Sequence, residues 1–322
     1  MSKQQHDLGT TRLDASALAV PGNTASATGA APSFMQRLRN RWEQAGSLLC
    51  VGLDAEYARL PASAQGQTGV LALDSEGQHD LVESSLTRFN QAIVDATADL
   101  VCAFKPNIAF YEAYGQAGLR ALSRTIDYIH VRYPDVPVLL DAKRGDIGNT
   151  SAAYARAIFD TCHADGVTLH PYLGREALEP FLQRADRAAF ILCRTSNLGS
   201  GEFQQLSVGE SGEPLYIHVA RAVANEWNTW GNCGLVVGAT YPAELQRVRA
   251  VVGDLPILVP GIGAQGGDLE ATMRAGLDHH GTGLLISASR SILYASSGLD
   301  FASAARREAQ RLVREMERLR HG

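Results

Sequence analysis

Cysteine is scarce in this sequence, and its arrangement excludes the roles that cysteine most often fills. Five cysteines are scattered over 322 residues, and no two of them form a CxxC pair. Neither the ligand spacing of a zinc site nor the framework of a disulfide-rich domain is present. An odd, dispersed set of thiols is typical of a reducing compartment, so we expect the protein to be cytoplasmic.

Long apolar runs and an excess of positive charge are also missing. No run of about 18 apolar residues exists, which argues against a transmembrane helix. The N-terminus lacks the basic-then-apolar pattern of a signal peptide. The formal net charge is -5 at pH 7, whereas proteins that bind nucleic acids or anionic membranes are usually basic. We therefore expect neither a nucleic-acid partner nor a membrane partner.

The chain divides into a polar N-terminal segment and a long globular part. Residues 1–33 are rich in Ala, Ser, Thr and Gly and have little apolar periodicity, so we interpret them as a flexible extension. Residues 34–322 are predicted to form a single catalytic domain. Its first helix is expected to follow an N-cap at Ser33 and to run through Trp42.

Eight short apolar runs alternate with helix-like stretches in the globular part. Continuous apolar runs of strand length are typical of parallel strands that are covered on both faces. The runs are 47–54, 99–106, 136–143, 166–171, 188–195, 234–240, 256–263 and 282–289. The predicted helices are 81–97, 116–132, 149–163, 174–185, 215–230, 242–252, 267–276 and 300–320. This order predicts an α/β fold, a (β/α)8 TIM barrel with outer helices. A doubly wound open sheet is the alternative, because periodicity alone does not reveal closure.

Charged side chains close the first three of these runs. Asp54 ends the first run, Lys105 the second, and Asp141 and Lys143 the third. A barrel gathers these ends on the face that carries the active site. Asp141 and Lys143 are two residues apart and would face the same side of a strand, and Asp146 follows in a glycine-containing turn. Alternating lysines and aspartates keep one another charged, which suits a proton-donating lysine better than a Schiff-base lysine. A purely structural ion network is disfavoured, because burying charges is costly.

A second group of residues predicts a phosphate site. The glycine-rich stretch PGIGAQGGD begins at Pro260 after the seventh run, and Arg290 follows the eighth. Backbone N–H groups of a glycine-rich loop can approach an anion closely, and barrels frequently bind phosphate at this pair of loops. The combination of glycines with an arginine is more specific than a glycine-rich loop by itself.

Together these motifs resemble the orotidine 5'-phosphate decarboxylase family. DAKRGDIGNT (141–150) stands between FKPN (104–107) and PGIGAQGGD (260–268), and the phrases HPYLG and RTSN resemble the bacterial subfamily called type 2. The resemblance covers about residues 34–320, with one departure at Leu198, where the family pattern has proline. It implies a lyase without cofactor or metal that converts orotidine 5'-phosphate to UMP and CO2, the last step of de novo pyrimidine biosynthesis.

The resemblance implies a role for each residue near the reacting carbon. Asp54 and Lys105 contact the ribose hydroxyls. Asp141 lies beside the substrate carboxylate, and Lys143 delivers the proton to C6. Loss of CO2 leaves an electron pair that the pyrimidine ring does not delocalise, so catalysis is expected to rest on electrostatics and positioning.

The resemblance also implies contacts to the two ends of the nucleotide. Ser196 contacts the pyrimidine edge, with Thr195 and Asn197 as alternatives for the same role. Gln265 and Arg290 hold the 5'-phosphate. The loops at 195–214 and 261–267 are candidates for closing over the substrate.

A homodimer with shared active sites is a further implication of the resemblance. Asp146, together with Ile147 and Thr150, is expected to reach into the site of the partner subunit. A two-fold axis would make this exchange reciprocal.

Other ionisable residues have ordinary structural interpretations. His170 follows the fourth run, where it either lines the pocket or is a packed histidine. His279 and His280 precede the eighth run and are interpreted as surface residues at the opposite end of the barrel. Arg144 is expected to point away from Lys143 and to form an outer ion pair.

Two other functions remain open from the sequence. A related barrel enzyme that acts on a sugar phosphate would bind Mg2+ and need a further acidic ligand, and its activity would be lost in EDTA. A non-enzymatic nucleotide-binding barrel would bind its ligand without turnover, but it would gain nothing from burying a complete lysine and aspartate array.

Overall fold

The computed structural model describes residues 31–65, 75–210, 212–262 and 267–321 of the chain. Residues 1–30, which form most of the predicted extension, and Gln265 lie outside the described residues. Contacts group Pro32–Gly322 into one unit, and the description below concerns this unit.

The predicted parallel barrel is confirmed by eight strands in the order β2-β1-β10-β9-β8-β5-β4-β3. The strands are β1 (Leu49–Gly52), β2 (Ala103–Lys105), β3 (Leu139–Arg144), β4 (Gly166–Leu169), β5 (Ala188–Arg194), β8 (Cys233–Val237), β9 (Ile257–Pro260) and β10 (Leu284–Ala288). Parallel bridges Phe104↔Val138 and Asn107↔Asp141 join the segments of β2 and β3, the two ends of this order. Because the ends meet, the sheet is a barrel and not the doubly wound open sheet that was the alternative.

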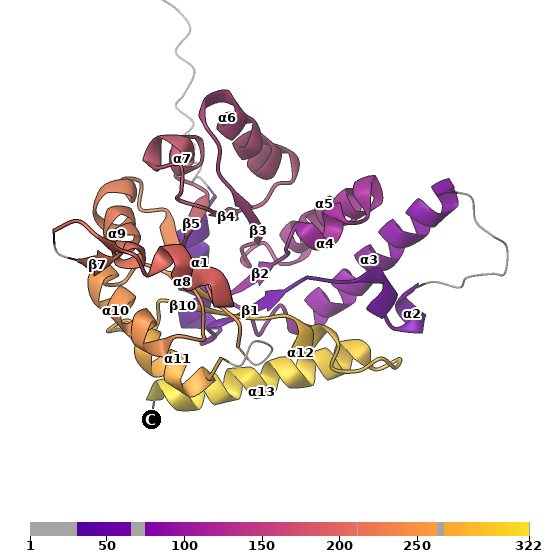
Figure 1. Ribbon diagram of the computed structural model, residues 1–322. Helices are drawn as coiled ribbons and strands as arrows, with labels where there is room; N and C mark the ends of the chain where they lie inside the picture. Colours follow the sequence, from indigo (N-terminus) through magenta and orange to yellow (C-terminus); the bar gives the residue numbers. More distant parts are fainter. Residues whose placement is uncertain (1–30, 66–74, 211, 263–266, 322) are drawn as a thin grey trace, which may run out of the picture. The chain divides into compact units, whose positions relative to one another are not determined.

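Helices surround the strands (Figure 1). The longer ones are α1 (Phe34–Gln44), α3 (Ser75–Thr97), α5 (Gly115–Arg132), α6 (Gly148–Arg156), α7 (Arg175–Leu182), α9 (Leu215–Ala222), α10 (Pro242–Val252), α11 (Leu269–Gly276) and α13 (Phe301–His321). The helices predicted over 149–163 and 215–230 change character, because α6 and α9 continue as π-helical turns at Ala157–Thr161 and Val223–Trp227. None of the described helices is long and apolar enough to cross a membrane.

Helix α1 closes the N-terminal end of the barrel. The predicted N-cap is present, because the Ser33 side chain accepts a hydrogen bond from the Gln36 backbone and the Gln36 side chain returns one to Ser33. The Phe34 ring packs edge-on against Phe190 of β5 at 5.8 Å. The indole of Trp42 donates to the carbonyl of Leu284 at the start of β10. With this end covered, the opposite end of the barrel remains open for a site.

The connections that follow β1 and β5 carry short elements. The first contains η1 (Tyr57–Arg59) and α2 (Ala62–Gln65) before α3. The second contains η3 (Leu198–Ser200), α8 (Gly201–Gln204) and the two-stranded sheet of β6 (Ser207–Val208) and β7 (Glu213–Pro214). Further short helices are α4 (Ala109–Glu112) after β2 and α12 (Arg290–Leu293) after β10.

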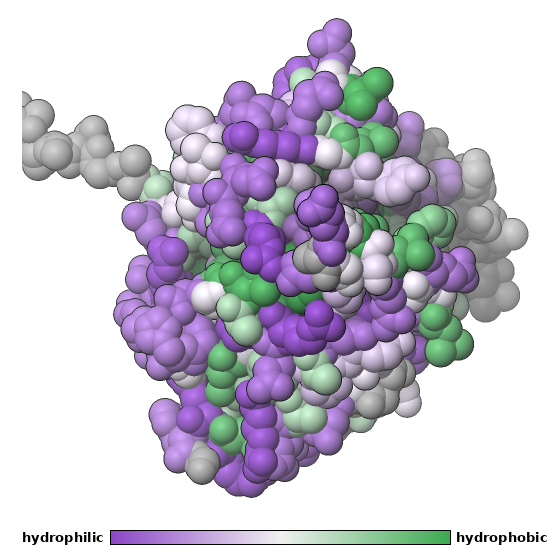
Figure 2. Space-filling model, turned by 60° about the vertical axis from the view of Figure 1, so that its left-hand side comes forward, coloured by the Kyte–Doolittle hydropathy of each residue, from purple (hydrophilic) through white to green (hydrophobic). Residues whose placement is uncertain are grey.

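In the terminal helix α13, polar and apolar residues lie on opposite faces, as helical periodicity requires. In α13, Ala305, Ala309, Leu312 and Met316 are buried against the barrel. On its exposed side, Arg306, Arg307 and Arg311 pair with acidic neighbours. The face in Figure 2 is mostly hydrophilic, with hydrophobic residues in separate groups. The arginine-rich terminal helix is therefore a solvated face over an apolar stripe.

Candidate active site

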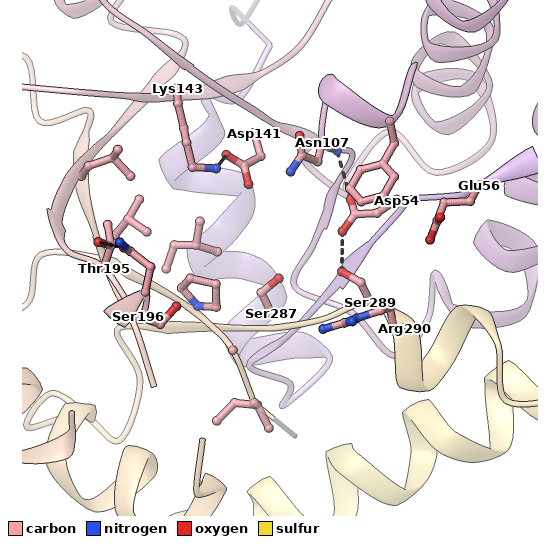
Figure 3. Close-up of a pocket in the computed structure, with 18 of the residues that line it drawn as sticks. Asp54, Glu56, Asn107, Asp141, Lys143, Thr195, Ser196, Ser287, Ser289 and Arg290 are labelled. Carbon is pink, nitrogen blue, oxygen red and sulfur yellow. Dashed lines mark hydrogen bonds and ion pairs between the residues drawn. The ribbon is translucent and has the colours of Figure 1, made fainter. Parts of the chain in front are cut away.

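A cavity of about 670 Å³ lies at the C-terminal ends of the strands, on the face where a barrel carries its active site. Most of the residues proposed from the sequence line this cavity, in several cases as Figure 3 shows. They are Asp54, Asp141, Lys143, Thr195, Ser196, Pro260 and Arg290. The residues come from the ends of five different strands, so the barrel brings them together although they are far apart in the chain.

The carboxylate of Asp141 joins two lysines. Its Oδ1 atom lies 2.6 Å from Nζ of Lys143, and its Oδ2 atom lies 3.4 Å from Nζ of Lys105. The side chain of Lys105 is 5% exposed and that of Lys143 is 50% exposed. Lys105 is thus enclosed in the barrel, whereas the ammonium group of Lys143 faces the open cavity.

The charges of this array support one another. Burial would raise the pKa of Asp141, but Lys105 and Lys143 more than offset this effect and hold the pKa well below its usual range. Burial would lower the pKa of Lys105, but Asp54 and Asp141 raise it above its ordinary value. The carboxylate of Asp141 and the ammonium group of Lys105 are therefore charged at neutral pH.

The backbone at Lys143 departs from a regular strand. Its φ angle is 47°, in the left-handed region that a lysine rarely adopts, and the pairing of β3 with β4 shifts between Leu140 and Arg144. Asp141 and Lys143 do face the cavity together, but this irregular turn, rather than a regular two-residue alternation, brings the ammonium group onto the carboxylate.

Thr168 of β4 holds this irregular backbone, and the sequence reasoning missed it. Its hydroxyl accepts hydrogen bonds from the backbone N–H groups of Ala142 and Lys143, at 3.1 and 3.0 Å. The same hydroxyl donates to Oδ1 of Asp141 at 2.8 Å. One buried threonine therefore fixes both charged side chains. Its only signal in the sequence is a polar residue inside an apolar run.

Asp54 is oriented by two further residues that sequence reasoning missed. Its Oδ1 atom accepts a hydrogen bond from the backbone of Asn107 at 3.1 Å, and Oδ2 accepts one from the Ser289 hydroxyl at 2.7 Å (Figure 3). A Cβ atom on Gly52 would lie 1.9 Å from this hydroxyl oxygen, so β1 requires glycine there. Asn107 stands in the FKPN motif and Ser289 directly precedes Arg290, so their polarity beside these residues was the available signal.

The turn after β3 carries the residues that were expected to serve a partner subunit. Asp146, Ile147 and Thr150 do not line the cavity of their own chain. Oδ1 of Asp146 accepts a hydrogen bond from the backbone of Ile147, whose side chain is 59% exposed. No ion pair to Asp146 is found among the described residues. Lys105, Asp141 and Lys143 therefore form the charge array within one chain, and Asp146 does not join it there.

Two predicted structural residues flank this turn. His170 does not line the cavity, and its Nε2 atom lies 3.0 Å from the carbonyl oxygen of Gly145, so it is the packed histidine of the two alternatives. Arg144 forms the expected outer ion pair, with Glu112 at 2.6 Å. Both Arg144 and Gly145 follow Lys143 directly in the chain, and their contacts lie outside the cavity.

A buried arginine supports the cavity wall that follows β5. Arg194 is 1% exposed. Its guanidinium pairs with Glu244 and with the hydroxyl of Ser200, and it donates to Oε1 of Gln204 at 3.3 Å. Gln204 in turn accepts a hydrogen bond from the backbone of Thr195 and donates one to the Thr195 hydroxyl, each at 2.9 Å. Arg194 and Gln204 thus hold the loop that carries the predicted pyrimidine contacts in place.

Comparisons with known proteins agree with this geometry. The model of the "Orotidine 5'-phosphate decarboxylase / HUMPS family" matches residues 47–307. The chain is 52% identical over 276 residues to orotidine 5'-phosphate decarboxylase of Azoarcus sp., which covers 86% of this chain and 95% of the relative. It is 53% identical over 289 residues to the protein of that name from Thermomicrobium roseum, covering 89% and 96% of the two chains.

Solved structures give the same result. The OMP decarboxylase of Leishmania donovani matches with a TM-score of 0.74 and 38% sequence identity, covering 90% of this chain and 99% of the other. A putative orotidine-monophosphate-decarboxylase from Toxoplasma gondii matches with a TM-score of 0.73 and 40% identity, covering 90% and 100%.

Proposed function

Since the chain belongs to the orotidine 5'-phosphate decarboxylase / HUMPS family, we propose that it converts orotidine 5'-phosphate to UMP and CO2, the last step of UMP biosynthesis. One observation carries the assignment of residues within this reaction. Asp141 pairs with Lys143, which lines the cavity, and with Lys105, which is enclosed in the barrel. This is the charge pattern that an electron pair developing on carbon requires.

The reaction breaks the bond between C6 and the carboxylate and leaves the electron pair on C6. Lys143 stabilises this charge with its ammonium group and then donates the proton that completes UMP. Asp141 lies beside the departing carboxylate and keeps Lys143 aimed at C6. Lys105 neutralises Asp141 from the enclosed side of the barrel. All atoms of the reaction come from the substrate and from Lys143, so the proposal requires no cofactor.

Other contacts of the proposed site hold the parts of the substrate that do not react. Asp54 and Lys105 bind the ribose hydroxyls, and Ser196 binds the pyrimidine edge, with Thr195 and Asn197 as the alternatives for that contact. Arg290, Pro260 and Gln265 bind the 5'-phosphate. Binding energy from this remote phosphate contributes to positioning the ring over Lys143.

We also propose that the protein is a cytoplasmic homodimer with shared sites. Asp146, Ile147 and Thr150 lie on the exposed turn and helix start after β3, where they are available to a second subunit. Exposed Tyr172 and Leu173 follow the neighbouring strand β4 and add apolar surface at the same end of the barrel. Asp146 of each subunit then supplies the fourth charge to the array of the other.

The assignment is tested by following the absorbance of orotidine 5'-phosphate during incubation with the purified protein, with and without EDTA. We expect turnover that EDTA does not reduce. Binding of the nucleotide without turnover would favour a non-enzymatic barrel. No turnover of orotidine 5'-phosphate, together with turnover of a sugar phosphate that is lost in EDTA and restored by Mg2+, would favour the sugar-phosphate enzymes.

Arg290→Ala should impair the phosphorylated substrate selectively. A guanidinium grips phosphate with two charge-assisted hydrogen bonds, so we expect a loss of about 2–4 kcal/mol in kcat/KM for orotidine 5'-phosphate. The nucleoside orotidine lacks the phosphate and should react at nearly the same low rate in both proteins. An equal loss for the two substrates would remove Arg290 from the phosphate site.

A further inference from the structure

Three metal-ligating side chains converge at the end of the barrel opposite the cavity. Asp254 precedes β9, and His279 and His280 precede β10. Nδ1 of His279 lies 2.8 Å from Oδ1 of Asp254, and the two imidazole rings lie 3.7 Å apart. One ligand atom from each residue falls within 4.8 Å of the other two. We propose that these three residues form a surface site for a divalent transition-metal ion of the Zn2+ type.

The turn that carries both histidines is fixed by its own hydrogen bonds. Oδ1 of Asp278 accepts from the backbone N–H groups of His280 and Thr282, at 2.9 and 2.7 Å. Oδ2 of Asp278 accepts from the Thr282 hydroxyl at 2.8 Å, and Gly281 supplies the positive φ angle that the turn needs. The backbone therefore presents two consecutive imidazoles beside Asp254 without having to fold on metal binding.

The distances suit a tetrahedral ion after a small adjustment. Zinc binds nitrogen and oxygen at about 2.0–2.2 Å, which places neighbouring ligand atoms roughly 3.3–3.5 Å apart. The His279–Asp254 separation of 2.8 Å is shorter than that, and no two of the three ligand atoms lie more than 4.8 Å apart. All three side chains are exposed, so rotation of the side chains can adjust these distances. Two imidazoles with one carboxylate favour Zn2+, Ni2+ or Cu2+ over Mg2+ or Ca2+. Solvent would complete the coordination.

Binding there would link the segment before β9 to the turn before β10. Because a metal that binds only the folded state stabilises it, the site would act on stability and not on decarboxylation at the other end of the barrel. This inference is independent of the proposed reaction.

The test is calorimetric titration of the metal-free, full-length protein with ZnCl2, together with its melting temperature in excess Zn2+. We expect the wild type to bind Zn2+, and His280→Ala and Asp254→Asn to bind it at least about tenfold more weakly. The rise in melting temperature should shrink in the same variants.

His163→Ala is the matched control, because His163 is another exposed histidine paired with an aspartate, Asp127, at 3.0 Å. It should titrate like the wild type. The site is refuted if the wild type binds no Zn2+, or if the wild type, His280→Ala and Asp254→Asn give the same titration curve.

The buried Arg194 carries a second, independent inference, which rests on the proposed function. We infer that Arg194 and Glu244 are positioning residues for the pyrimidine. Glu244 on α10 pairs with the Arg194 guanidinium and also accepts a hydrogen bond from Gln205 at 2.8 Å. The guanidinium stacks 4.2 Å from the ring centre of Tyr241. Arg194 is 1% exposed and contacts all of these partners, so it fixes the loop after β5 in one conformation.

Gln204 connects the loop after β5 to the cavity. Gln204 lines the cavity and holds the backbone and the hydroxyl of Thr195, and the Thr195 hydroxyl donates to Oδ1 of Asn197 at 2.6 Å. The segment from Thr195 to Asn197 therefore has its hydrogen-bonding groups oriented before substrate arrives. Loosening this segment should weaken recognition of the pyrimidine and leave the phosphate end unaffected.

The test compares two ligands of the same site. In Glu244→Gln and Arg194→Met, UMP should bind about tenfold more weakly, the effect of losing hydrogen bonds to a charged group. Ribose 5-phosphate, which lacks the pyrimidine, should bind within about twofold of the wild type. Glu244→Gln keeps the volume of the side chain, so the two affinities can be measured in this variant even if Arg194→Met does not fold.

Arg249→Met is the matched control, because Arg249 is a buried arginine at the opposite end of the barrel that donates to the carbonyls of Gly276 and Gly283. It should lower stability without changing the ratio of the two affinities. The inference is overturned if Glu244→Gln leaves this ratio at the wild-type value. Failure of the wild type to bind UMP or to turn over orotidine 5'-phosphate would instead refute the proposed function.

Discussion

Lys143→Ala is expected to abolish decarboxylation while the protein remains folded and binds UMP. The substitution removes the proton donor, which by itself contributes about 10²–10⁴-fold in rate. It also removes the nearest positive charge from C6 and exposes the carboxylate of Asp141, whose ionised form Lys105 still favours by lowering its pKa. The anionic substrate should therefore bind somewhat more weakly than UMP, which lacks the carboxylate.

The neighbouring Arg144→Ala is the control for this experiment. Arg144 is also a cation at the end of β3, but it pairs with Glu112 outside the cavity, so turnover should change little. The measurement is single-turnover decarboxylation, with UMP affinity as the check on folding. Substantial turnover by Lys143→Ala would mean that another group protonates C6.

Mixing two inactive variants should restore activity if the active sites are shared. Homodimers of Lys143→Ala and of Asp146→Asn are each expected to be nearly inactive, because every site lacks one essential charge. In a mixed dimer, one site collects both substitutions and the other collects neither. Random reassortment makes about half of the dimers mixed, so about a quarter of all sites become intact.

The measurement is turnover after the two variants have been mixed under dissociating conditions and returned to assay buffer. Differently tagged subunits confirm the exchange by co-purification. Activity should rise toward about a quarter of the wild-type value. Activity that stays at the level of the separate variants despite confirmed exchange would assign Asp146 to the site of its own subunit.

The sequence determined the eight strands and the end of them that carries the chemistry. Continuously apolar runs are dictated by burial on both faces, and this local property identified all eight strands within a few residues of their observed bounds. Charged residues at the ends of such runs, such as Asp54 and Lys143, are conspicuous because a buried charge is costly unless it is paired. Motif resemblance then named the reaction, since the spacing of DAKRGDIGNT is a property of the chain itself.

Only the tertiary structure decided how these residues are held. Thr168 reaches Asp141, and Gln204 reaches Thr195, through contacts that depend on the pairing of β3 with β4 and on the path of the loop after β5. The left-handed backbone of Lys143 depends on an irregularity in that pairing.

The same holds at the opposite end of the barrel, where Asp254 meets two histidines that the sequence marked only as surface residues. Local periodicity identifies a strand and the face it buries. Which side chains from different strands touch is set by the register and closure of the barrel, and those follow from all eight strands packing together.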